Sequence, residues 1–144
     1  MKASGAFLAP AGGAWPDLHA GVAADSLVCT ALAQVSEGSS WVKLIADFPG
    51  LDGDFLHARA TYDLDLVREL VAAIHAAGAR VMAHVFSVLV TELVRIGVDS
   101  IDHGPLADRA TINLMADRGT LWTPTVTTIA SYLGVLPVWR ETLP

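Results

Sequence analysis

Residues 67–84, VRELVAAIHAAGARVMAH, decide the fold class, because they run from an amphipathic helix through a glycine into a short apolar strand. Asp63 is placed to cap the start of this helix, and Gly78 to end it in the left-handed conformation. Residues 80–84 then follow as a buried strand. The apolar positions of the helix, at i, i+3, i+4 and i+7, are Val67, Leu70, Val71 and Ile74.

The same unit of helix, glycine and strand recurs along the chain. Alternation of this kind indicates βαβ units with parallel pairing. About five parallel strands are expected, at 5–8, 41–45, 80–84, 98–101 and 121–123. The helices between them are expected at 27–35, 63–77, 87–96 and 108–118. The pattern fits either a small doubly wound sheet or a partial (β/α)₈ TIM barrel, since a complete barrel needs about 250 residues.

Composition narrows the class of protein. Hydrophobic residues make up 53% of the 144 residues, which suits a parallel sheet covered on both faces. The formal net charge is −6 without a basic cluster, so nucleic acid is not expected as a partner. No apolar run is long enough to predict a membrane span. Cys29 has no second cysteine to pair with, which favours a reducing, cytoplasmic location.

Two of the five histidines stand out by position. His84 and His103 each come where a predicted strand ends, and ligand sites of α/β folds are built at those ends. One such histidine would be an ordinary core residue. Two histidines at the carboxyl ends of successive strands bring two potential metal ligands to the same edge of the sheet. His75 is expected on a helix surface, and His19 and His57 in exposed loops.

Lys43 is unusual because it sits inside the apolar strand 41–45. Burying an unpaired ammonium group is costly. The residues leave two explanations open. Either Lys43 reaches solvent at an edge, or its amine is neutralised, paired or chemically modified at a site.

Taken together, these segments resemble the amidohydrolase superfamily, most closely its imidazolonepropionase-like and prolidase-like members. The similarity runs from about residue 5 to 128, and its specificity lies in the order and spacing of the segments. The segments that carry it are WVKLI (41–45), VMAH (81–84), DSIDHG (99–104), LMADRG (114–119) and TPT (123–125).

The resemblance implies a (β/α)₈ barrel that holds one or two divalent metals, usually zinc. It implies that Lys43 is the strand-four lysine, which CO₂ carboxylates in binuclear members. His84 and His103 would be the strand-five and strand-six ligands. Tyr62 resembles a tyrosine that contacts the substrate carboxylate. The implied reaction is hydrolysis of an amide or other C–N bond in a small molecule, such as a cyclic amide or a dipeptide.

The sequence also departs from the family pattern. It has no HxH motif, and it stops before the strand-eight aspartate, so no catalytic residue can be assigned. We therefore expect residues 1–144 to form one partial barrel of roughly strands three to seven, with an irregular extension at 126–144. Asp102 neighbours His103, but strand alternation predicts that it points to the opposite face.

Three functions follow as hypotheses. The first is a metal-dependent hydrolase of which the chain is a truncated part, so that the chain alone binds metal weakly and has little activity. The second is an inactive barrel fragment that self-associates or needs the missing barrel remainder. The third is a doubly wound ligand-binding domain, although no GxGxxG or P-loop pattern follows a strand.

Overall fold

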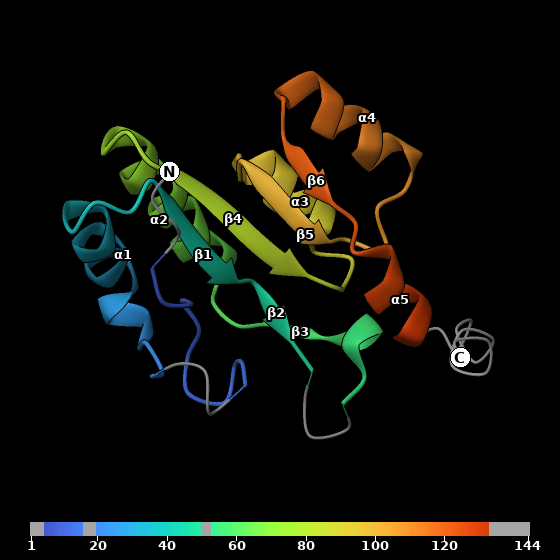
Figure 1. The fold of residues 1–144 in the computed structure, drawn as a ribbon, viewed down its shortest axis with the longest axis horizontal. Coiled ribbons are helices and arrows are strands. Elements are labelled where there is room, and N and C mark those ends of the chain that lie inside the picture. The colour runs from blue at the N-terminus through green and yellow to red at the C-terminus, as the bar shows by residue number, and fades with distance from the viewer. Residues whose placement is uncertain (1–4, 16–19, 50–52, 133–144) are drawn as a thin grey trace, which may run out of the picture.

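A four-stranded parallel sheet forms the centre of the protein (Figure 1). The computed structural model describes residues 5–15, 20–49 and 53–132. The sheet order is β1-β4-β5-β6, and a parallel bridge from Leu8 to Leu44 continues it beyond β1. The strands are β1 (Trp41–Ile45), β4 (Arg80–Val85), β5 (Ser100–His103) and β6 (Leu121–Thr123).

The order of the strands separates the two predicted architectures. Each strand of the sheet lies beside the one before it, always in the same direction. A doubly wound sheet instead reverses direction at a switch point, where its ligand binds. The described strands therefore form a segment of a (β/α)₈ barrel, as one of the two expectations had it.

Helices connect the strands, and Figure 1 shows α2 and α3 together on one face of the sheet. An antiparallel pair, β2 (Asp47–Phe48) and β3 (Arg59–Ala60), follows β1. No helix in the described ranges is long and apolar enough to cross a membrane. The helices are α1 (Leu27–Ser36), α2 (Leu64–Ala76), α3 (Val90–Ile96), α4 (Arg109–Arg118) and α5 (Val126–Tyr132), with short 3₁₀ turns η2 (Ala24–Ser26) and η3 (Phe55–His57).

The predicted helix ends are mostly confirmed. Asp63 caps α2 by accepting a hydrogen bond from the amide of Asp65 at 2.8 Å. Asp108 caps α4 in the same way, through the amide of Thr111 at 2.7 Å. Gly78 has a φ of 75°, the left-handed conformation expected of a glycine after a helix.

Four segments differ from the prediction. The helix expected at 87–96 begins at Val90, and the strand expected at 5–8 is a single bridge at Leu8. The strand expected at 98–101 lies at 100–103, because the Val98 amide bonds to the Leu93 carbonyl and so still belongs to the end of α3. Residues 126–132, expected to be irregular, form α5. Thr125 begins that helix, since its carbonyl accepts the Thr128 amide at 2.9 Å. Residues 133–144 lie outside the described ranges.

The two faces of the sheet differ in chemistry. Residues that pair across the strands point to the same face, so the register assigns each side chain. On β1, β4 and β5 the face packed against the helices carries buried apolar side chains, which include Val42, Leu44, Val81, Ala83, Val85 and Ile101. The other face, which lines the interior in a barrel, carries Lys43, Ile45, Met82, His84, Ser100 and Asp102.

Candidate metal centre

Lys43 is buried, and its amine forms an ion pair with the carboxylate of Asp102. The pairing of β1 with β4 and of β4 with β5 places both side chains on the interior face. The prediction that Asp102 points to the opposite face is therefore wrong. Of the two explanations for Lys43, the structure shows a paired ammonium rather than one that reaches solvent.

His103 accounts for the error over Asp102. Its φ is 71°, a left-handed value that few residues other than glycine adopt. Regular alternation would point His103 to the helix face, away from Asp102. The left-handed turn at the end of β5 redirects its side chain toward His84 instead. Unusual backbone conformations of this kind are often found at functional sites.

His84 and His103 meet at the carboxyl ends of β4 and β5. Their ring centroids are 4.6 Å apart. Burial, together with the nearby charges of His103 and Lys43, lowers the pKa of His84 to about 3. The ring of His84 is therefore neutral. Its Nε2 atom is buried, and no described atom forms a hydrogen bond with it.

Neighbouring strands and loops hold His103. Its Nδ1 lies 2.5 Å from the hydroxyl of Thr125, and its carbonyl accepts a hydrogen bond from Trp122 Nε1 at 2.9 Å. Burial lowers the pKa of His103, the charge of Lys43 adds to this effect, and Asp102 opposes it. Because Thr125 occupies Nδ1, Nε2 is the ring nitrogen that could bind a metal.

Aromatic side chains surround the two imidazoles. The ring of Phe86 lies 4.4 Å from that of His103 and 5.4 Å from that of His84. Trp15 contacts the other side of His84, with 5.7 Å between the ring centroids. Phe55 packs against Phe86 at 5.2 Å. This wall keeps the histidine rings in an apolar setting, where a neutral imidazole is favoured.

Asp47 lies close to this group and was not predicted. It is fully buried at the start of β2, and its carboxylate accepts backbone hydrogen bonds from Phe86 and Ser87. Burial raises the pKa of Asp47, and the hydrogen bonds from Ser87 and Phe86 oppose the rise. A sequence signal existed, because an aspartate directly follows the apolar run 41–46. Its partners are backbone amides 39 and 40 residues away, which no local pattern reveals.

Tyr62 lies in the main hydrophobic core and not among the metal-site residues. It is 6% exposed, and its hydroxyl donates to the carbonyl of Val22 at 2.8 Å. Burial raises the pKa of Tyr62 to about 12. Its hydroxyl is thus engaged within the fold, and its contact with a substrate stays a prediction.

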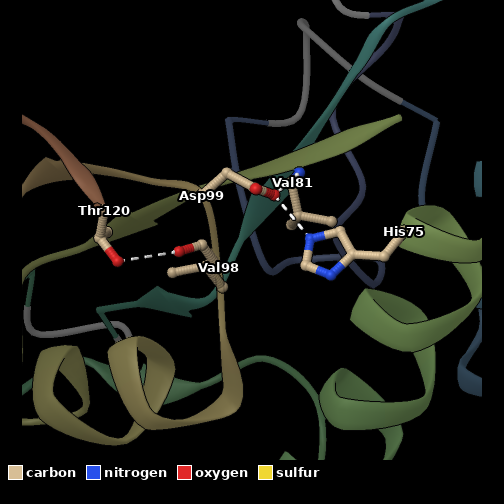
Figure 2. A network of polar contacts seen from close by, with 5 residues as sticks. All are labelled: His75, Val81, Val98, Asp99 and Thr120. Atoms are coloured by element: carbon tan, nitrogen blue, oxygen red, sulfur yellow. Dashed lines mark hydrogen bonds and ion pairs between the residues drawn. The ribbon is translucent and has the colours of Figure 1, made fainter. Parts of the chain in front are cut away.

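The remaining histidines lie elsewhere. His75 is on α2, near the start of β4, where its Nε2 lies 2.8 Å from the Asp99 carboxylate (Figure 2). This is the opposite end of the strand from His84. His57 is exposed and lies 2.6 Å from Asp54. His19 lies outside the described residues.

These residues fit a bound metal only in part. The partnerless Nε2 of His84 and the adjacent ring of His103 supply two nitrogen donors, the usual ligands of zinc together with thiolates and carboxylates. Lys43 is paired as an ammonium and could join them only as a carbamate. Within the described ranges, no cluster of three or more His, Cys, Asp or Glu side chains could hold a metal.

Comparison with known proteins gives the same class of fold. No family model matches the chain. Uncharacterized proteins of Mycobacterium tuberculosis and Mycobacterium bovis are 34% identical over 103 residues, which is 71% of this chain and 27% of theirs. The crystal structure of A. niger ochratoxinase superimposes with a TM-score of 0.74 at 19% identity, covering 96% of this chain and 38% of that one. The crystal structure of an amidohydrolase gives 0.63 at 26% identity, covering 83% and 30%.

The parallel sheet, with Lys43 in β1 and two histidines at the carboxyl ends of β4 and β5, has the fold of a segment of a (β/α)₈ barrel. The chain is similar in fold to an amidohydrolase at 26% identity, in agreement with the resemblance that its sequence predicted. It spans about a quarter to two fifths of the length of the proteins it matches.

Proposed function

We propose that the chain carries part of the site of a metal-dependent hydrolase that cleaves an amide or other C–N bond in a small molecule. The observation that supports this most is the buried Nε2 of His84, which has no hydrogen-bond partner within the described structure and belongs to a ring 4.6 Å from a second imidazole. A buried polar atom without a partner is costly, and a metal ion would satisfy it.

In this proposal His84 and His103 would hold one zinc ion. Lys43 would become a further ligand by leaving its ion pair with Asp102, losing a proton from its ammonium and adding CO₂, with release of a second proton, to form a carbamate. Such a metal, when bound, would supply a water of lowered pKa and would polarise the scissile carbonyl. The low pKa of His84 keeps its nitrogen lone pair available for binding. Phe86 and Trp15 limit the access of water to the rings. Asp102 pairs with the Lys43 ammonium before carboxylation. Tyr62 would have to break its hydrogen bond to the Val22 carbonyl before it could contact the substrate carboxylate.

Zinc titration of the purified chain by calorimetry tests the proposal. We expect weak binding and little or no hydrolytic activity, because only two nitrogen ligands are in place. His84→Ala and His103→Ala should each abolish the binding while far-UV circular dichroism shows that the fold persists. His75→Ala is the matched control, since His75 lies at the other end of β4, and it should bind zinc like the wild type.

Two outcomes would count against this proposal in different ways. If the wild type and His84→Ala bind zinc with equal affinity, His84 is not a zinc ligand. Tight binding of two zinc ions with turnover would contradict the expectation that the chain alone has little activity.

A non-catalytic role is a second candidate, and the exposed apolar residues of β6 favour it. Leu121 is 55% exposed and Trp122 is 38% exposed. In the described structure β6 pairs only with β5, so its other edge is available to a further strand. This candidate is a barrel segment that associates with a second copy or with the rest of a barrel. For either candidate, the single cysteine supports our proposal of a cytoplasmic location.

A further inference from the structure

Asp47 has a setting that the proposed chemistry does not use. It is 0% exposed and lies two residues after β1, the strand that carries Lys43. Both of its carboxylate oxygens accept the amide of Phe86 at 3.0 Å, and Oδ2 also accepts the amide of Ser87 at 2.7 Å. Among the described residues no cation forms an ion pair with it.

A buried carboxylate without a cation is costly unless hydrogen bonds compensate it. Here the compensation comes from the backbone of the loop that follows β4. Both carboxylate oxygens take part, so Asp47 fixes the backbone two and three residues beyond His84 through three contacts.

The ring of Phe86 carries this constraint to the histidines. Its amide is held by Asp47, and its ring contacts His103 at 4.4 Å and His84 at 5.4 Å. The neighbouring Ala46 amide also donates to the His84 carbonyl at 3.0 Å. Residues 46 and 47 thus bind the backbone that runs from the His84 carbonyl to the Ser87 amide.

We infer that Asp47 is a positioning residue, which orients the imidazoles of His84 and His103 through the backbone and ring of Phe86. The reason for orienting the two rings rests on the proposed metal function. The contacts from Asp47 through Phe86 to the histidines are present whether or not a metal binds. Asp47 acts here through other residues, since its hydrogen bonds in the described structure go to the backbone amides of Phe86 and Ser87.

Asp99 provides a matched control. It is also an aspartate that accepts a backbone amide of β4, from Val81 at 2.8 Å, and it lies at the opposite end of that strand (Figure 2). Replacing Asp99 should lower stability by removing a similar hydrogen bond. It should leave the histidine rings unchanged, because Asp99 bonds to His75 and not to Phe86.

The test compares Asp47→Asn with Asp99→Asn. Imidazole ¹H–¹⁵N spectra of the metal-free proteins report ring orientation, and zinc titration reports affinity. We expect Asp47→Asn to shift the ring signals of His84 and His103 and to weaken zinc binding about tenfold, as the loss of outer-shell partners does. Asp99→Asn should change neither quantity. Asp47→Ser, which keeps one acceptor oxygen, replaces Asp47→Asn if that variant does not fold.

The inference is overturned if the Asp47 variant leaves the ring signals unchanged, or if Asp99→Asn shifts them equally. If the wild type binds no zinc, the proposed metal function fails. The ring signals of the metal-free protein then still decide whether Asp47 positions the histidines.

Discussion

Lys43 and Asp102 are 59 residues apart in the sequence, and β4 lies between their strands, yet their side chains form an ion pair. Taking both charges out of water is costly, and the pair compensates each partner only while the other is present. The lysine that the family resemblance assigns to a carbamate is thus held as an ammonium by a carboxylate of the next strand but one.

Removing one partner of this pair should destabilise the fold. Asp102→Ala leaves the Lys43 ammonium buried, and we expect a loss of about 3 kcal/mol in the free energy of unfolding. The double variant Lys43→Met with Asp102→Leu removes both charges and should recover most of that loss. Urea denaturation of the single and double variants measures the difference. If the double variant is less stable than Asp102→Ala, the unpaired Lys43 ammonium is not the cause of the destabilisation.

Some site residues could be predicted from the sequence and others could not. Lys43, His84 and His103 were predicted because a charged or imidazole side chain in an apolar strand is unusual by itself. Asp47 and Thr125 were not, because their partners are distant in sequence. Asp102 was misplaced because alternation assumes regular strand geometry, which ends at His103.

Among the elements, Tyr62 joins the loop before α2 to the segment before η2 and α1 through its bond to the Val22 carbonyl. The core position of this tyrosine makes the packing of α2 sensitive to its protonation. In the unfolded chain a tyrosine ionises near pH 10, whereas burial raises the pKa of Tyr62 to about 12 in the folded protein.

The shift sets the direction of a pH effect. Because the folded pKa is raised, the stabilisation by neutral Tyr62 is complete below about pH 10 and is lost as the pH rises toward 12. Tyr62→Phe should lose about 1 kcal/mol at neutral pH, the usual worth of a hydrogen bond. The difference between the two proteins should shrink at alkaline pH. Thermal unfolding between pH 7 and 11 measures this, and a constant difference would contradict it.

Helices and strands were predicted well where a local signal marks their ends. Asp63 and Gly78 bound α2 through their own side chain and backbone preference, so the sequence suffices there. The start of β5 was missed because it depends on how far the cap of α3 extends past Gly97. The helix α5 was missed because its first turn follows a threonine in a left-handed conformation, with a φ of 46°.

At the scale of the whole molecule, the exposed apolar edge at β6 should make the chain associate. Multi-angle light scattering after size exclusion is expected to give a mass above the 15.1 kDa of one chain, rising with concentration. Leu121→Lys places a charge on the edge strand and should restore the mass of a single chain. Ile112→Lys, on an exposed apolar position of α4, should not. A wild type that stays at 15.1 kDa at every concentration would contradict this expectation.

The ion pair between β1 and β5 also bears on the order in which the chain folds. During synthesis Lys43 emerges 59 residues before Asp102. An early intermediate that docks β1 on β4 alone would bury an ammonium group with nothing to neutralise it, which is unfavourable. We therefore expect β1, β4 and β5 to assemble in one cooperative step rather than strand by strand. The Lys43 ammonium would then also prevent β1 and β4 from forming a stable intermediate before β5 is in place.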